Sequence, residues 1–273
     1  MKKLLLFLVL CAITVWSCKK SNSSKNSGSG YYLSAAVNVT DKASLVDSMI
    51  YDSSHRLAAF LQIKYDTSTG VPLQVSTSIL FTLPGGSAPA TAYTYQSPNG
   101  YELHSLSYDN QGRIVKDTCA ATGYVATFTY PANAIAIRVL YDGTPMNNQI
   151  DTLFMSGGNI AKANTWMPND AGTADSLQGS LNFGYSSVAN PFYHPSINAS
   201  VGPLLYVFTV NGLGGGLDPV SAKTQSSISG KIDGLPSNLT IPFTQTLDSK
   251  GRLSELSASV FGFGGEAIYF RYY

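Results

Sequence analysis

Apolar and polar residues alternate with a period of two along most of the chain, the pattern of strands with one buried face. In Tyr124–Tyr130, for example, Tyr124, Ala126 and Phe128 share one face. Turn-forming residues separate such runs, as at Pro84-Gly85-Gly86 and Asp142-Gly143. About 14 candidate strands at regular spacing predict an all-β fold. We expect an antiparallel β-barrel or a strongly curved open sheet built from successive hairpins.

A seven-residue motif recurs three times and carries the chemistry of a hairpin turn. Its copies are Tyr51–Leu57, Tyr108–Ile114 and Leu247–Leu253, each with Asp second and Arg sixth. The Asp side chain can accept a hydrogen bond from the backbone N–H two residues later. The Gly can adopt the positive φ that a β-bulge requires. In the first copy His55 replaces this Gly, and His is among the residues that tolerate positive φ. We interpret eight positions as structural turn residues rather than as a row of ligand-binding side chains: Asp52, Arg56, Asp109, Gly112, Arg113, Asp248, Gly251 and Arg252.

One stretch, around residues 190–224, does not follow the strand pattern. It contains Pro191, Pro195, Pro203 and Pro219 and a glycine-rich run near Gly214. Long connections inside a compact domain are usually functional or mobile. We therefore predict one irregular insert here, which plugs a barrel or covers an open sheet edge.

The first 18 residues have the anatomy of a secretory signal that ends at a cysteine. Two lysines precede an apolar run, Leu4–Val15, and Ser17 stands directly before Cys18. The run is shorter than the ~20 residues that a membrane-spanning helix needs. The arrangement resembles the lipobox of bacterial lipoproteins, although Trp16 departs from that pattern, and an ordinary signal peptide cut nearby is the alternative. The resemblance implies removal of residues 1–17 and lipidation of Cys18.

Residues 18–30 consist mainly of Ser, Asn, Lys and Gly, a composition that predicts a flexible tether. The single folded domain is then expected over 31–273. Lys19 is not the Asp that marks inner-membrane retention in some lipoproteins, so the resemblance favours the outer membrane. Because no acidic residue precedes Asp41, a periplasmic face is favoured over the cell surface.

Charge excludes several classes of partner. Only 12% of the residues are charged, and removal of Lys2 and Lys3 would leave 15 basic against 16 acidic residues. Nucleic-acid binding normally requires a basic patch, and electrostatic membrane docking requires a polybasic segment. We expect neither, so attachment to the membrane would depend on the N-terminal lipid.

Candidate catalytic and metal-binding residues are few. His55, His104 and His194 lie far apart in the sequence without metal-ligand spacing, and no nucleophile elbow or zinc-protease motif occurs. Cys119 lies in an apolar stretch and is interpreted as a buried structural thiol, because no positioned histidine is visible in the sequence. We therefore assign no catalytic residue, no metal site and no cofactor.

Several features together resemble one family of Bacteroidota-type lipoproteins. They are the signal, the Ser/Lys/Asn tether, the Tyr-Asp-x-x-Gly-Arg-Leu copies and the segment Leu181–Tyr193, which leads through Asn190-Pro191 into an apolar connection. The family carries a porin-like domain of unknown function with such hairpins. The resemblance implies a β-fold and no reaction, cofactor or catalytic residue.

We accordingly predict an outer-membrane lipoprotein that is a non-enzymatic binding or structural module, for a glycan or an apolar ligand. Three alternatives stay open: a carbohydrate-active hydrolase, a lipid-carrying β-groove protein and an integral outer-membrane barrel. Ser48, Thr152 and Ser176 lie in three-residue segments that resemble the O-glycosylation signal of these bacteria. The protein partner and the oligomeric state are not predicted.

Overall fold

The computed structural model describes residues 33–39, 43–54, 56–66, 72–98, 100–140, 148–168, 175–193, 200–212, 220–233, 238–260 and 263–272. Over these residues it contains sixteen strands and the helix α3. The first eight strands are β1 (Leu33–Val39), β2 (Ala43–Tyr51), β3 (Leu57–Asp66), β4 (Pro72–Thr82), β5 (Ala92–Ser97), β6 (Gly100–Tyr108), β7 (Ile114–Cys119) and β8 (Tyr124–Thr129). The remaining elements are β9 (Ala134–Leu140), β10 (Asn148–Ser156), β11 (Asn159–Pro168), β12 (Asp175–Ala189), α3 (Gly202–Gly212), β13 (Lys223–Ile232), β14 (Leu239–Leu247), β15 (Leu253–Val260) and β16 (Phe263–Tyr272).

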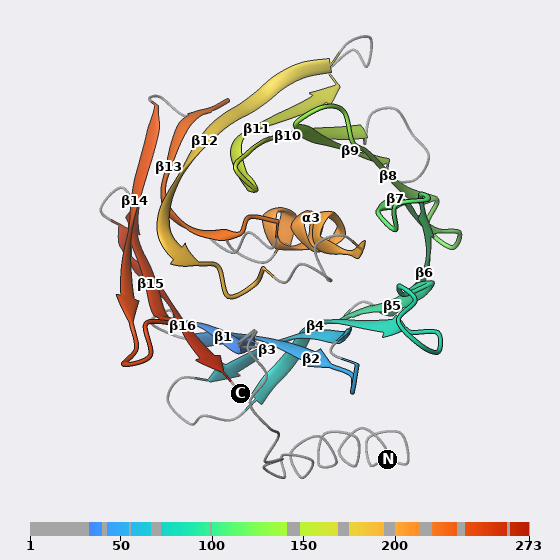
Figure 1. Ribbon diagram of the computed structural model, residues 1–273, viewed down its shortest axis with the longest axis horizontal. Helices are drawn as coiled ribbons and strands as arrows, with labels where there is room; N and C mark the ends of the chain where they lie inside the picture. The colour runs from blue at the N-terminus through green and yellow to red at the C-terminus, as the bar shows by residue number, and fades with distance from the viewer. Residues whose placement is uncertain are drawn as a thin grey trace. The chain divides into compact units, whose positions relative to one another are not determined.

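The strands form one antiparallel sheet in which each strand pairs with its neighbours in the sequence. β1 pairs with β2 on one side and with β16 on the other, which closes the sheet into a barrel (Figure 1). The all-β, hairpin-built class predicted from the alternation is therefore confirmed, with more strands than the 14 or so expected. Closure leaves no unpaired sheet edge, which in an open sheet would be a site for aggregation.

Strand alternation places the connections in two groups at opposite ends of the barrel. The links β2–β3, β6–β7 and β14–β15 are the three Asp-to-Arg turns, and they share one end with the β4–β5 link and with the connection that contains α3. β1 also begins at this end and β16 finishes there. We call it the turn end.

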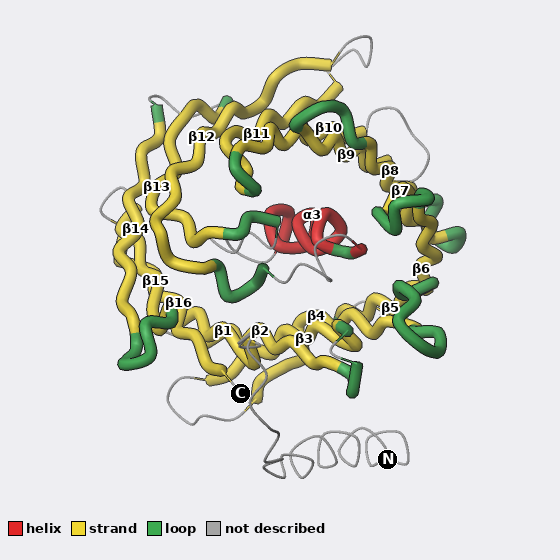
Figure 2. The backbone as a smooth tube through the Cα atoms, in the orientation of Figure 1, coloured by secondary structure: helices red, strands yellow, loops and turns green. Residues whose placement is uncertain are grey.

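The interior of the barrel is apolar and holds α3. Figure 2 shows the helix inside the ring of strands, and its residues Leu204 and Leu205 are almost completely buried. They belong to the same core cluster as Phe60, Ile137 and Phe128 of the strands. A helix that is apolar on all sides is stable when buried on all sides, and the barrel supplies that surrounding.

The predicted insert therefore contains a helix and does not cover a sheet edge. Asn190 begins it: the side-chain amide donates to the Ser221 carbonyl (2.8 Å) and the side-chain oxygen accepts the Phe192 N–H (3.0 Å). Phe192 packs edge-on against Phe270 of β16, with ring centroids 6.0 Å apart. These contacts direct the chain from β12 back into the barrel before α3 starts.

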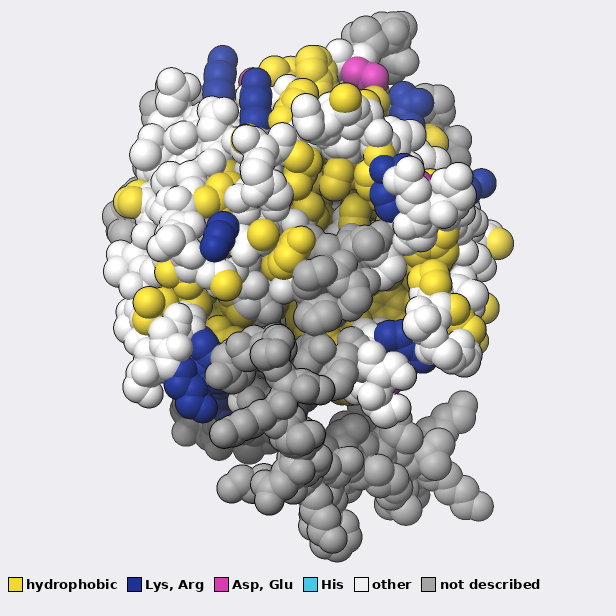
Figure 3. Space-filling model, viewed as in Figure 1, with side chains coloured by type: hydrophobic (Ala, Val, Ile, Leu, Met, Phe, Trp, Pro, Cys, Tyr) yellow, Lys and Arg dark blue, Asp and Glu magenta, His cyan; other side chains and the backbone are white. Residues whose placement is uncertain are grey.

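The outward faces carry polar and charged residues together with exposed apolar ones such as Leu103 and Tyr269. Lys116, Arg138 and Arg271 are exposed, and Arg138 stands between the buried Ile137 and Val139 in β9. Lys162 and Glu255 occupy outward positions on β11 and β15. Figure 3 looks onto one end of the barrel and shows apolar side chains toward the middle of that face and Lys and Arg mainly toward its rim. Over the part of the chain that is described, no helix is long and apolar enough to cross a bilayer.

Candidate functional site

The three Asp-to-Arg turns share one set of hydrogen bonds. In the second copy, Asp109 Oδ1 accepts the N–H groups of Gln111 and Arg113 (both 2.9 Å), and Oδ2 accepts the Arg113 Nε–H (2.8 Å). Gly112 has φ +74°, a conformation that side chains rarely adopt. The copies around Asp52 and Asp248 repeat these contacts, and Gly251 also has φ +74°.

Aromatic side chains complete two of these turns. The Arg113 guanidinium lies 4.2 Å from the centre of the Tyr130 ring, and the Tyr130 hydroxyl donates to the Ile114 carbonyl (2.7 Å). Arg252 and Tyr272 repeat the arrangement at 4.4 Å. In the first copy, Arg56 donates instead to two carbonyls of the β4–β5 link, those of Pro84 (2.8 Å) and Ala88 (2.9 Å).

The pKa values of the turn aspartates follow from these contacts. Desolvation raises the pKa values of Asp52 and Asp109, but hydrogen bonds from the following Arg outweigh it and leave both pKa values below the usual range. At Asp248 the Arg252 backbone and side-chain hydrogen bonds are the leading cause of a lowered pKa. Each carboxylate is thus held ionised by its own turn, and the arginine groups that could bind a ligand already have protein partners.

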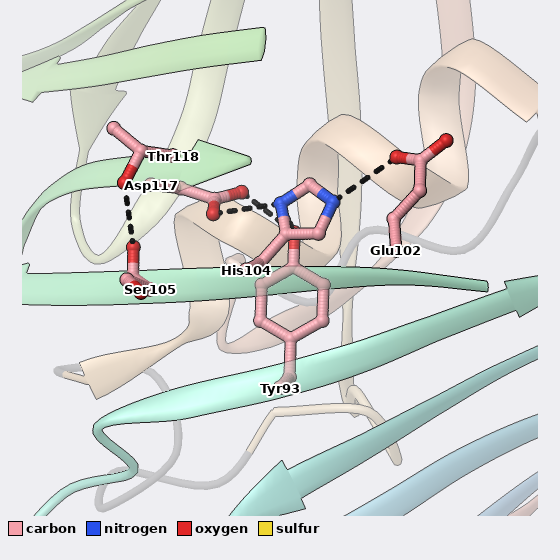
Figure 4. A network of polar contacts seen from close by, with 6 residues as sticks. All are labelled: Tyr93, Glu102, His104, Ser105, Asp117 and Thr118. Carbon is pink, nitrogen blue, oxygen red and sulfur yellow. Dashed lines mark hydrogen bonds and ion pairs between the residues drawn. The ribbon is translucent and has the colours of Figure 1, made fainter. Parts of the chain in front are cut away.

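A second cluster of polar side chains lies inside the barrel on β5, β6 and β7 (Figure 4). Glu102 and His104 are two residues apart on β6, so both point inward, and Asp117 and Cys119 do the same on β7. Register brings Tyr93 of β5 opposite His104. His104 is 3% exposed and Asp117 is completely buried.

Short polar contacts connect Tyr93, His104 and Asp117 in this cluster. The Tyr93 hydroxyl donates to Asp117 Oδ2 (2.6 Å), and Asp117 Oδ1 lies 2.9 Å from His104 Nδ1. Desolvation, reinforced by the Asp117 charge, raises the pKa of Tyr93 far above its usual range, so the hydroxyl keeps its proton. The Tyr93 hydroxyl also lies 2.8 Å from His104 Nδ1, so the phenol, the carboxyl group and this nitrogen are all in mutual contact.

The other imidazole nitrogen faces a third acidic group. His104 Nε2 lies 3.3 Å from Glu102 Oε2, and one ligand atom from each of Glu102, His104 and Cys119 lies within 4.8 Å of the others. The Tyr93 ring stacks on the imidazole (centroids 4.4 Å apart), and the Tyr124 ring meets it edge-on at 5.2 Å. The aromatic rings keep the imidazole in this orientation.

Sequence reasoning missed this cluster, although part of its signal was present. Cys119 is buried, and a positioned histidine does lie beside it, contrary to the assumption made from the sequence. The i, i+2 spacings Glu102/His104 and Asp117/Cys119 place each pair on one strand face. Strand register, which joins the two pairs, could not be read from the sequence.

A pocket of about 300 Å³ opens at the turn end of the barrel. Its apolar lining comes from Leu57, Leu83, Pro89, Ala90 and Val201, and its polar lining from serines 54, 87 and 200, Arg56 and Gly112. The pocket therefore lies between the first two Asp-to-Arg turns and the residues that lead into α3. None of these lining residues is aromatic.

The remaining predicted sites are scattered. Cys18 and the tether lie outside the described residues, as do His55 and His194. Thr152 is half-buried in β10 and Ser48 in β2. Ser176, in β12, donates to the Met167 carbonyl (3.3 Å) and accepts from the Gln178 amide (2.6 Å).

No protein-family model matches the chain, and no curated protein is similar to it. Solved structures do match. A porin-like protein from Bacteroides uniformis ATCC 8492 aligns with a TM-score of 0.55 at 14% identity, over 88% of this chain and 98% of that one. A porin-like protein from Bacteroides vulgatus ATCC 8482 aligns with a TM-score of 0.50 at 12% identity, over 89% and 99%. These similarities show a shared fold.

Proposed function

We propose that this chain is a lipid-tethered binding module of the outer membrane, non-enzymatic, whose ligand is apolar and enters the pocket at the turn end. The observation that carries the proposal is the distribution of side chains. Apolar residues and α3 fill the interior, while outward positions carry charges such as Arg138 and Arg271. A membrane-spanning barrel has a continuous apolar band on its outer face, whereas here exposed apolar side chains such as Tyr269 stand beside charges such as Arg271.

The lining of the pocket favours an apolar ligand over a glycan. Sugar recognition commonly relies on stacking against aromatic rings, and the pocket lining lacks them. Its five apolar residues and its serine hydroxyls suit a short hydrocarbon chain with a polar end. The volume lies at the lower limit of known small-ligand sites, which are about 300–1,000 Å³.

Ligand binding can be measured by thermal unfolding of the detergent-purified protein with single-chain fatty acids and, separately, with soluble oligosaccharides. A ligand at 100 times its dissociation constant should add about 2.7 kcal/mol. For a domain of this size, that raises the melting temperature by about 5–10 °C. Mass spectrometry of the purified protein would also detect a lipid that co-purifies.

A matched pair of substitutions tests whether the ligand binds in the turn-end pocket. Ser54→Trp would fill the pocket, whereas Lys250→Trp places the same ring at the equivalent position of the third turn. Both backbone N–H groups donate to the turn aspartate at 2.9 Å, so the two turns should tolerate the change equally. Ser54→Trp should abolish the fatty-acid shift and Lys250→Trp should preserve it. A shift with oligosaccharides alone would instead favour a glycan-binding protein.

A further inference from the structure

Glu102 and His104 meet in a way that a hydrogen bond explains poorly. Charge-assisted N–H···O bonds are usually about 2.7–2.9 Å long, and the His104 Nε2 to Glu102 Oε2 distance is 3.3 Å. Nδ1 already contacts Asp117 Oδ1 (2.9 Å) and the Tyr93 hydroxyl (2.8 Å), so Nε2 is the imidazole nitrogen left to bind a further group beside Glu102. Two arrangements account for the long contact: a weak hydrogen bond from Nε2–H to Glu102, or a cation that both atoms bind.

The distance matches the second arrangement. Two N or O ligands that each lie about 2.0–2.1 Å from one tetrahedral ion are about 3.3–3.4 Å apart. The Cys119 sulfur lies within 4.8 Å of one ligand atom each from Glu102 and His104, so it can supply a third ligand. We propose that Glu102, His104 and Cys119 bind one Zn²⁺ ion inside the barrel, with a water molecule as the fourth ligand.

The donor set selects this class of metal. A thiolate and an imidazole bind zinc well, whereas Ca²⁺ and Mg²⁺ require oxygen ligands. Asp117 is the positioning residue: a carboxylate that accepts Nδ1–H directs the opposite nitrogen toward a metal, and the Tyr93 hydroxyl holds Asp117 in turn. The Glu102 side chain is 38% exposed, so the site has a route from solvent.

The proposal can be tested on the full chain, untagged and purified from membranes in mild detergent. After chelator treatment, the protein is titrated with Zn²⁺ alone, and bound metal is counted by elemental mass spectrometry. Co²⁺ is then used as a spectroscopic probe, because a cobalt–thiolate bond gives a near-ultraviolet charge-transfer band. We expect one ion per chain and that band.

Substitutions distinguish a specific metal site from nonspecific metal binding. Glu102→Gln and Cys119→Ser should each weaken zinc binding by more than about 100-fold, and Cys119→Ser should also remove the cobalt band. Asp117→Asn should weaken binding by about 10–100-fold. Glu255→Gln, which removes one carboxylate from the outer face of β15, should change nothing.

Two results would overturn the proposal. One is the absence of stoichiometric binding, which would leave a weak hydrogen bond as the explanation of the 3.3 Å contact. The other is binding that Glu102→Gln and Cys119→Ser leave unchanged. Because Glu102 is partly exposed, Glu102→Gln should fold even if Cys119→Ser does not, so the test keeps an interpretable variant. Fatty-acid binding at the turn-end pocket is measured separately and does not affect this outcome.

Discussion

At the residue scale, the turn aspartates make a prediction about acid stability. Their folded-state pKa values are lowered, so the stability that they contribute is present above the unfolded-state pKa of about 3.9 and is lost as the pH falls through the folded values. Replacing Asp52, Asp109 and Asp248 by Asn keeps an oxygen that accepts backbone N–H groups but removes the ion pairs with Arg. We expect a lower melting temperature at pH 7.

The size of that loss should itself depend on pH. The triple variant and the wild-type protein should converge as the pH falls below about 4, because the wild-type carboxylates then become protonated. Melting temperatures measured by circular dichroism between neutral and acidic pH test this. Asp175→Asn, an exposed change at the start of β12, serves as the control. A constant offset at all pH values would show that the ion pairs are not its cause.

At Asp151 the pKa is raised rather than lowered, so the expected effect of pH on stability is reversed. Burial raises its pKa, and the hydrogen bonds from Thr165 (2.6 Å) and Gln149 (2.8 Å) offset this only in part. Its ionised form therefore costs stability at neutral pH, and the cost disappears as the pH falls through the folded pKa toward the unfolded value. Asp151→Asn should raise the melting temperature at pH 7 by about 2–4 °C, which corresponds to ~1 kcal/mol.

Melting temperatures of the Asp151→Asn variant, measured over the same pH range, test this prediction. The gain should shrink as the pH approaches about 4, where the wild-type side chain also becomes neutral. Gln149 can present its amide oxygen to the new amide group, so the hydrogen bonds need not be lost. A destabilised variant at pH 7 would show that the negative charge is required there.

At the element scale, α3 is predicted to be part of the core rather than a removable plug. Leu204 is completely buried among strand residues, and Leu→Ala changes at such sites cost about 2–5 kcal/mol. Leu204→Ala should lower the denaturant midpoint accordingly. Leu103→Ala, on the outer face of β6 where the side chain is 60% exposed, should cost less than about 0.5 kcal/mol. Equal midpoints for both variants would show that α3 can leave the barrel without unfolding it.

The elements also show how far the sequence could predict the structure. Alternation predicted β8 nearly to its ends, because inward residues such as Ala126 and Phe128 are buried and the outward Thr129 is exposed. The helix α3 was missed because it is apolar on every side and so lacks the amphipathic period that identifies most helices. The Glu102, His104 and Cys119 cluster was missed because it depends on the pairing of two strands.

At the scale of the whole molecule, the charged outer face and the proposed N-terminal lipid make one joint prediction. Lys116, Arg138 and Arg271 interrupt the outer surface, and Arg or Lys near the bilayer midplane costs a membrane barrel about 2–4 kcal/mol each. The barrel should therefore not insert into lipid, and acylation of Cys18 should provide its attachment.

Replacing residues 1–18 by an ordinary cleavable secretory signal removes the lipid without leaving an uncut leader. The exported chain should then appear in the soluble periplasmic fraction, whereas the unaltered chain and its Cys119→Ser variant should stay with the membranes after an alkaline wash. If the chain without the lipid site resisted that wash, the strands themselves would be the membrane anchor, and the outward charges would have to lie outside the hydrocarbon layer.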